Sequence, residues 1–251
     1  MLSHNILINT GNILSLNEVK KNAGQNSSDE LIETLKITLK DYENPDDAST
    51  KIIGRDDASV KNLDRRELKI TVKVFISSSK SESLKEALDQ VFNVLQTDSI
   101  ESLVIAYEKS DNTDDVLTSL QSLWTSIEEY IKLGKLSSVG VSDVDTDVFI
   151  QLFQWANTKP NIVQINLATC CVVPPALQIF TKENDVQLLT HSDPCQILPK
   201  DAVNDIFGSD VNLRWVSRYQ VHVKCRGVLS TKGYLVYIDK PTIQRNGRIS
   251  E

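Results

Sequence analysis

The sequence predicts an α/β protein in which strands and helices alternate along the chain. From residue 68 onward, apolar runs of strand length alternate at least five times with segments of helical periodicity, joined by short connections. The chain has 251 residues, 40% of them hydrophobic, which is enough for a large core without disulfide or metal staples. Repeated units of this kind build a parallel sheet, either a closed barrel or an open doubly wound sheet.

The first 66 residues are less regular than the rest. Ile6–Leu16 is expected to form a hairpin, with its turn at Thr10-Gly11-Asn12 between two apolar runs. A helix is expected to begin at Ser28, whose side chain can cap it. Residues 41–66 are rich in Asp, Asn, Lys and Arg, which predicts an irregular polar segment.

From Leu68 onward each element has a clear pattern. Strands are expected at Leu68–Ile76, Leu103–Tyr107, Ser138–Ser142, Ile162–Leu167, Val186–Thr190 and Val221–Lys224. Helices are expected at Ser81–Leu95, Val116–Leu133, Thr146–Ala156, Ala176–Thr181, Ala202–Phe207 and Val211–Tyr219. No G-x-G-x-x-G follows the first strand and no Walker loop occurs, which argues against an open nucleotide-binding sheet. We expect a single domain over residues 1–251.

Composition narrows the classes of function. The net charge of −7 argues against a nucleic-acid binder, which normally carries a basic face. No apolar run is long enough for a transmembrane helix and the N-terminus lacks a secretory pattern, so we expect a cytoplasmic protein with no membrane partner. The four cysteines, Cys170, Cys171, Cys195 and Cys225, show no C-x-x-C pattern, and no metal site is expected.

Several motifs follow one another in a recognisable order. They are Leu133-Gly134-Lys135-Leu136, Val139-Gly140-Val141-Ser142-Asp143, Val163-Gln164-Ile165-Asn166, Leu213-Arg214-Trp215-Val216 and Val223-Lys224-Cys225. In this order they resemble the aldo-keto reductases. The resemblance implies a TIM (β/α)8-type barrel, here with the N-terminal hairpin and the irregular segment near 41–66 as additions.

Finer segments resemble the regulatory, or modifier, subunits of glutamate–cysteine ligase. They include Ile8-Asn9-Thr10-Gly11-Asn12, the run from Gln164 to Pro175, and Lys224-Cys225-Arg226-Gly227 with Lys232-Gly233-Tyr234. This resemblance implies a heterodimer with the catalytic subunit of that ligase. It also implies a non-catalytic role: improving the use of glutamate and relieving feedback inhibition by glutathione in glutathione biosynthesis.

The reductase chemistry itself is not recognisable in the sequence. Aldo-keto reductases need a Tyr proton donor, a Lys that lowers its pKa, an Asp and a His. Lys73 matches the Lys, but Tyr42 has no matching Asp ahead of it, and Tyr107 stands where the family has its His. We therefore expect no catalytic residue, and Lys73 to be either a solvated or ion-paired side chain or a remnant of the catalytic Lys.

A nicotinamide cofactor is matched only in part. Ser142 and Gln164 match two of the three positions that hold the carboxamide, and Lys224 matches the phosphate-binding Lys. Asp143 replaces the expected Asn, and His191 replaces the stacking Tyr. We expect no cofactor and treat Ser142, Gln164 and Lys224 as remnants. The alternative function, an NADPH-binding reductase-like oxidoreductase or sensor, stays open.

Two further features concern contacts with a partner. The segment Val221–Tyr237 mixes cations with aromatic residues, and Lys224, Arg226 and Tyr234 are the candidate partner-binding residues. The alternative is that this segment is the last strand followed by a solvated tail. Cys195 follows Asp193-Pro194, so we expect an exposed loop thiol that could respond to oxidants.

Overall fold

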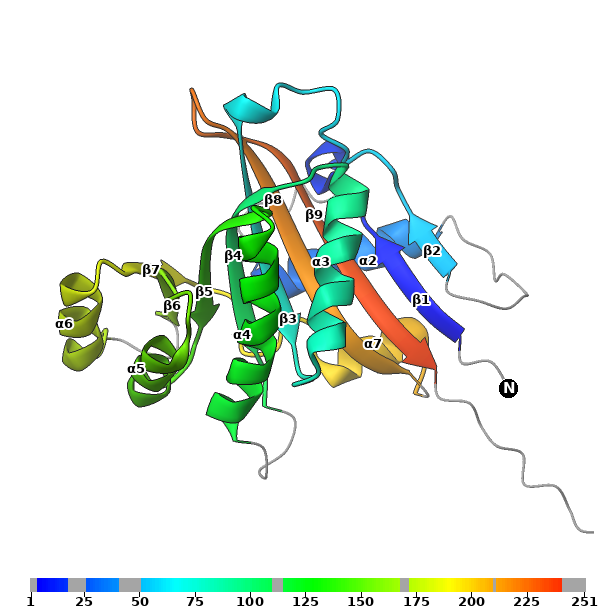
Figure 1. Cartoon of the computed structure of the whole chain (residues 1–251). Coiled ribbons are helices and arrows are strands. Elements are labelled where there is room, and N and C mark those ends of the chain that lie inside the picture. The colour runs from blue at the N-terminus through cyan, green and yellow to red at the C-terminus, as the bar shows by residue number, and fades with distance from the viewer. Residues whose placement is uncertain are drawn as a thin grey trace, which may run out of the picture.

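The computed structural model describes residues 4–17, 26–40, 51–109, 115–167, 172–209 and 211–240. The described strands form one sheet with helices on both sides (Figure 1). They are β1 (His4–Asn9), β2 (Lys51–Gly54), β3 (Leu68–Ile76), β4 (Ile100–Tyr107), β5 (Leu136–Ser142), β6 (Ile162–Asn166), β7 (Gln187–His191), β8 (Asn212–Val223) and β9 (Val228–Lys240). The helices are α2 (Ser27–Lys40), α3 (Ser81–Leu95), α4 (Val116–Lys132), α5 (Thr146–Trp155), α6 (Pro175–Glu183) and α7 (Lys200–Phe207), with 3₁₀ turns η1 (Ile13–Ser15) and η2 (Arg65–Glu67). No described helix has the length and apolar character needed to span a membrane.

The predicted repeat of β/α units is confirmed between β3 and β7. These five strands are parallel neighbours in chain order, and the sheet order is β2-β1-β9-β8-β3-β4-β5-β6-β7. Parallel pairing places the carboxyl ends of the five strands at one edge of the sheet. We call this edge the carboxyl edge and the opposite one the amino edge.

The sheet is mixed and its described strands do not close into a ring. The α/β class of the prediction is confirmed, but the expected barrel of parallel strands is not what the hydrogen bonds form. The reason lies in β8 and β9, which pair with each other antiparallel, while β8 also pairs antiparallel with β3. The free side of β3 is thereby occupied, and among the described residues β7 pairs only with β6.

Helices bury the sheet on both of its faces. On β8, Trp215 packs with the core under α3 and α4, whereas the next residue, Val216, packs with the core under α2 and α7. Leu7 and Ile8 of β1 divide in the same way. Successive strand side chains point to opposite faces, so this alternation identifies two helical layers around one sheet, as Figure 1 also shows.

The expected N-terminal hairpin is wrong. Residues 4–9 form β1, but its partners are β2, in parallel, and β9, antiparallel. The second apolar run does not return as a strand, because Asn12 caps the 3₁₀ turn η1 by accepting a hydrogen bond from Leu14 N at 3.2 Å. The apolar residues of this run instead pack against distant parts of the chain. Ile13, for example, lies in the core under α2 and α7.

The helix expected at Val211–Tyr219 is also wrong, since this segment belongs to β8. β3 and β9 pair with this segment on its two sides, and this long-range pairing overrides local helical preference. Val221–Tyr237 is neither a last barrel strand nor a tail: it contains the turn of the β8–β9 hairpin and much of β9.

Other predictions agree closely with the structure. β3 and α3 have the expected bounds, and α3 buries the face that carries Leu84, Leu88 and Val91. In the polar segment 41–66, residues 41–50, including Tyr42, lie outside the described residues, and residues 51–54 form β2. Residues 55–64 are irregular, as expected.

Candidate functional site

A cluster of polar and charged side chains lies on one face of the sheet near its carboxyl edge. We call it the carboxyl-edge cluster; its members are Lys73, Ser142, Asp143, Gln164, Asn166, His191, Asp193 and Arg218. They come from β3, β5, β6, β8, the end of β7 and the two loops that follow β5 and β7. The carboxyl ends of parallel strands are the usual place for a functional site in α/β sheets.

Lys73 is the centre of this cluster and is 5% exposed. Its Nζ donates hydrogen bonds to Ser142 Oγ at 3.0 Å, Gln164 Oε1 at 3.1 Å and Asp193 Oδ2 at 2.9 Å. An ammonium has three protons to donate, so these acceptors use all of them. Burial lowers the pKa of Lys73, and the Asp193 carboxylate opposes that effect.

Asp193 is the counter-charge for two buried cations. Besides Lys73, it accepts hydrogen bonds from both terminal nitrogens of Arg218, with Nη2 at 3.0 Å, and from Ser27 Oγ at 2.7 Å. Burial alone would raise the pKa of this carboxyl group, but hydrogen bonds from His191 and Arg218 and the nearby cations hold it well below its ordinary value. Asp193 therefore stays ionised and ties the loop after β7 to β3, β8 and α2.

His191 connects Asp193 with Asp143. Its Nδ1 accepts the backbone N–H of Asp193 at 3.1 Å, and its Nε2 lies 2.9 Å from Asp143 Oδ2. In the neutral ring Nδ1 is the acceptor, so the proton lies on Nε2 and faces Asp143. In the protonated ring Nδ1 also carries a proton, and it lies 3.4 Å from Asp193 Oδ2. Burial lowers the pKa of His191, but hydrogen bonds to Asp143 and Asp193 outweigh it and raise that pKa.

Asp143 is held in a left-handed backbone conformation, with φ of 58°. Its carboxylate accepts hydrogen bonds from Ser142 Oγ at 2.8 Å and from the Asn166 backbone N–H at 2.9 Å. These bonds satisfy the side chain locally, which offsets the cost of the unusual conformation.

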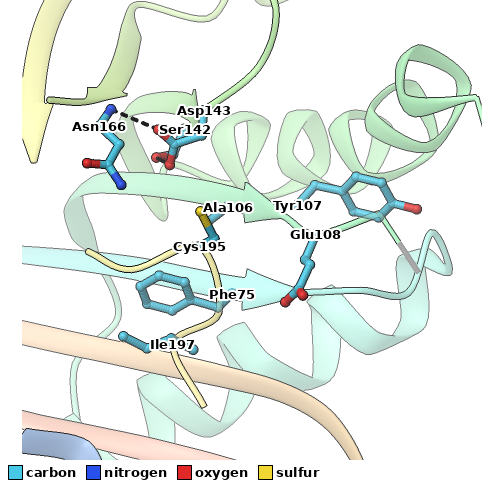
Figure 2. A pocket seen from close by; sticks show the side chains of 9 residues that line it. All are labelled: Phe75, Ala106, Tyr107, Glu108, Ser142, Asp143, Asn166, Cys195 and Ile197. Atoms are coloured by element: carbon cyan, nitrogen blue, oxygen red, sulfur yellow. Dashed lines mark hydrogen bonds between the residues drawn. The ribbon is translucent and has the colours of Figure 1, made fainter. Parts of the chain in front are cut away.

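A cavity of about 230 Å³ opens beside the cluster at the carboxyl edge (Figure 2). Its lining residues are Phe75, Ala106, Tyr107, Glu108, Ser142, Asp143, Asn166, Cys195 and Ile197. In Figure 2 the Tyr107 ring points away from the other side chains. Asp143 and Glu108 make the polar part of the wall acidic, and the cations of the cluster are held by Asp193.

The structure brings together two of the three predicted cofactor remnants. Ser142 and Gln164 meet at Lys73, but Lys224 lies at the amino edge, where its backbone N–H donates to Glu67 O at 2.8 Å. Its Nζ donates to Arg66 O at 2.8 Å. The grouping of Lys224 with Ser142 and Gln164 is therefore wrong, because β8 runs antiparallel to β3 and carries its C-terminal end away from the carboxyl edge.

Of the predicted partner-binding residues, Lys224 and Arg226 are exposed in the β8–β9 turn. Tyr234 is fully buried, and its hydroxyl donates to Glu30 Oε1 at 2.6 Å. Tyr234 is therefore wrong as a surface anchor: its aromatic ring serves the core under α2.

Two of the four cysteines lie among the described residues. Cys195 and Cys225 are free and exposed, while Cys170 and Cys171 lie outside the described residues. Cys195 lines the carboxyl-edge cavity. In the described parts of the chain, no group of three or more His, Cys, Asp and Glu side chains is arranged to hold a metal ion.

Sequence reasoning missed Arg218, Asp193 and Asn166. Arg218 was hidden in a segment expected to be helical. Period-two alternation around it, with Tyr219 and Val221 facing the other core, was the signal that could have found it. For Asp193 and Asn166, only their positions just after strands pointed to the carboxyl edge.

The chain is similar to several known proteins. The model of the aldo/keto reductase family matches residues 42–193. The glutamate–cysteine ligase regulatory subunit of Homo sapiens is 34% identical over 248 residues, covering 91% of this chain and 90% of that protein. A putative glutamate–cysteine ligase regulatory subunit of Schizosaccharomyces pombe is 25% identical, covering 68% of this chain and 71% of that protein. Among solved structures, an aldo/keto reductase from Brucella melitensis aligns with a TM-score of 0.44 and 20% identity, covering 52% of this chain and 49% of that one.

The chain therefore belongs to the aldo/keto reductase family and, within it, to the glutamate–cysteine ligase regulatory subunits.

Proposed function

We propose that this chain is a non-catalytic subunit that forms a heterodimer with the catalytic subunit of glutamate–cysteine ligase in the cytoplasm. In that complex it improves the use of glutamate and relieves feedback inhibition by glutathione. One observation supports the absence of catalysis in this proposal. Three acceptors of the same chain take up all three protons of the Lys73 ammonium group.

A reductase lysine works by lowering the pKa of a neighbouring tyrosine, and for this its ammonium must face that hydroxyl. In this chain every Lys73 proton is already donated to Ser142, Gln164 or Asp193. Asp193 is also fixed by Arg218, so releasing Lys73 would leave a buried cation without its counter-charge. The arrangement supports a structural use of Lys73.

Regulation then requires a difference in binding free energy. A subunit changes its partner only by binding one state of that partner more tightly than another. A preference of about 1–3 kcal/mol for the glutamate-competent state shifts apparent affinities by roughly 5- to 150-fold. A rigid sheet with two helical layers is suited to supply that preference, because it deforms little on binding.

We propose that the β8–β9 turn takes part in the contact with the catalytic subunit. Arg226 is exposed there and is a residue type favoured at interfaces. We expect Arg226→Ala to weaken the complex by about 1–2 kcal/mol, or roughly 5- to 30-fold in Kd, without lowering the stability of the chain. Isothermal titration against the catalytic subunit measures this change. A Lys182→Ala variant is the matched control, since Lys182 is an exposed cation on α6, far from the β8–β9 turn. An Arg226→Ala chain that binds as tightly as the wild type removes this turn from the interface.

We further propose that the chain works without a nicotinamide cofactor. Ser142 and Gln164 both have Lys73 as a partner, and Lys224 lies at the other edge of the sheet. Fluorescence titration with NADPH tests this proposal. Saturable binding with quenching would favour the alternative, a reductase-like oxidoreductase or sensor.

Cys195 is our candidate for a redox response, because its thiol is free and exposed. We expect a Cys195→Ser chain to assemble normally under reducing conditions and to lose part of the response of the complex to oxidant. Cys225→Ser is the matched control, as the second exposed free cysteine. Identical oxidant responses in wild type and Cys195→Ser would end this idea.

One experiment separates the regulatory proposal from its alternative. The chain is mixed with the catalytic subunit and examined by sedimentation, and in parallel it is incubated alone with NADPH and a panel of carbonyl compounds. We expect a 1:1 complex and no NADPH oxidation. Absence of a complex together with NADPH oxidation would show that the chain is an altered reductase.

A further inference from the structure

A second hollow, separate from the carboxyl-edge cavity, lies at the amino edge of the sheet. It has a volume of about 310 Å³ and is lined by Lys69, Thr71, His222, Lys224 and Gly227. We call it the amino-edge hollow. Two of its lining residues, Lys224 and Gly227, belong to the β8–β9 turn.

Strand pairing explains why these side chains gather. Lys69 of β3 is paired with His222 of β8, and Thr71 is paired with Gln220. Residues paired across neighbouring strands have their side chains on the same face, and residues two apart along a strand share a face. Lys69, Thr71 and His222 therefore share the face that carries Lys73 and Arg218 further along the same two strands.

Lys224 joins them through the β8–β9 turn. Its backbone N–H is held by Glu67 O at 2.8 Å and its Nζ by Arg66 O at 2.8 Å, which fixes it beside the start of β3. Figure 1 shows the tip of this hairpin close to η2. Gly227 completes the turn with φ of 61°, so the hollow is bounded by a tight backbone turn.

The cations of the hollow lack a counter-charge. Within the described ranges, neither Lys69 nor Lys224 forms an ion pair with a carboxylate. Glu101 is bound instead by Arg65 and by the backbone of Ile70. This differs from the carboxyl-edge cluster, where Asp193 balances Lys73 and Arg218.

The neighbouring side chains on this face are neutral hydrogen-bonding groups. Ser102 of β4 is paired with Thr71, and Ser138 of β5 is paired with Ser102. Hydroxyl groups next to lysines are the groups that bind phosphate and carboxylate oxygens. The long-range field of a chain with net charge −7 repels anions, so an anion bound here would be held by the local site.

We propose that the amino-edge hollow binds a small multivalent anion, one that carries a phosphate group or two or more carboxylates. Lys69 and Lys224 supply point charges from two sides, His222 adds a donor and Thr71 a hydroxyl. The volume of about 310 Å³ suits a small molecule rather than a folded partner.

The test uses the whole chain without the catalytic subunit, so that its outcome is independent of the regulatory proposal. Pyrophosphate and citrate are titrated separately at an ionic strength of about 0.15 M, where the Debye length is about 8 Å and diffuse attraction is screened. Isothermal titration gives the affinity, and the shift in Tm gives a second readout. We expect saturable 1:1 binding of at least one of the two anions, and the better one identifies phosphate or carboxylate as the recognised group.

Lys69 and Lys224 are both exposed, so replacing them tests the anion site without disturbing the core. Lys69→Gln with Lys224→Gln removes both charges and is expected to weaken the anion at least tenfold, with an unchanged Tm in the absence of the anion. Lys182→Gln is the matched control, because Lys182 is exposed on α6 at the far end of the sheet. No saturable binding, or an equal loss in the Lys182→Gln control, would overturn the proposal. So would a double variant that binds both anions normally but no longer assembles with the catalytic subunit, since the hollow would then be a protein contact.

Discussion

Two buried cations, Lys73 and Arg218, share the single carboxylate of Asp193. Their side chains are 5% and 15% exposed, and the Asp193 side chain is 7% exposed. A buried ion pair adds little net stability compared with apolar packing, but removing one partner leaves an uncompensated charge in a region of low dielectric constant. The Asp193 side chain is therefore the residue on which the carboxyl-edge cluster depends most.

We expect Asp193→Asn to lower the free energy of unfolding by about 3–5 kcal/mol, because both cations lose their counter-charge. Urea denaturation measures the change. Asp205→Asn is the control: Asp205 pairs with Lys36 on the surface with 70% of its side chain exposed, and we expect no measurable change. A small effect of Asp193→Asn would mean that water reaches the cluster and that Lys73 is not locked.

The pH dependence of stability follows from the same residues. Asp193 and Asp143 have folded pKa values below their ordinary ones, so their contribution is present above pH of about 4 and is lost as pH falls further. His191 has a raised pKa, so its contribution is complete below pH of about 6.5 and is lost as pH rises through the folded pKa.

A His191→Gln variant tests this assignment. We expect the wild type to lose stability between pH of about 6.5 and the raised pKa of His191, and the variant to show a flatter profile over that window. The measurement is the free energy of unfolding of both proteins at a series of pH values from 5 to 9. Parallel profiles for the two proteins would show that His191 titrates alike in the folded and unfolded chains.

At the scale of elements, the β8–β9 hairpin makes the sheet mixed, and it depends on a close approach at Gly233. A Cβ at Gly233 would lie 2.1 Å from Gly11 O and 2.3 Å from the Tyr219 hydroxyl oxygen. The Tyr219 hydroxyl also donates to Gly11 O at 2.9 Å, so the neighbours cannot move without losing a buried hydrogen bond.

Gly233→Ala is accordingly expected to cost about 2–3 kcal/mol, at the upper end of ordinary substitutions. The control is Gly208→Ala, where φ is 93° but a Cβ would meet nothing within 4 Å. Thermal unfolding of the two variants separates steric crowding from backbone strain. Equal losses would indicate that β9 can shift to accommodate the methyl group.

The hairpin also marks where the sequence stops predicting the fold. β3 to β7 were predicted because each strand is a short apolar run and each helix carries one apolar face, both local patterns. β8 was expected to be partly helical, because no residue pattern between Val211 and Tyr219 indicates that β3 and β9 flank this segment. The partner of a strand is a long-range property that single-sequence patterns do not carry.

The same limit applies to the site. Ser142, Gln164 and Lys73 were found from motifs, and the structure places them in contact. Lys224 was grouped with them by motif order alone and lies at the other edge. Tyr234 was expected at the surface because tyrosine is favoured at interfaces and the segment also carries cations, whereas β9 turns its side chain towards α2 and Glu30.

At the scale of the whole molecule, the two polar sites lie on one face of the sheet and differ in their charge balance. The carboxyl-edge cluster is internally paired and is expected to hold the structure together. The amino-edge hollow keeps unpaired cations near the exposed β8–β9 turn. A regulatory subunit needs surfaces for binding rather than a reactive centre, and this division fits that need.

We propose that the chain acts by changing the preference of its partner for glutamate. The direct measurement is the initial rate of glutamate–cysteine ligase at limiting glutamate while this chain is titrated into the catalytic subunit, with and without glutathione. Our account predicts that the apparent affinity for glutamate rises, that glutathione inhibits less, and that both effects saturate at one chain per catalytic subunit. Unchanged glutamate affinity and unchanged glutathione inhibition at saturation would contradict it.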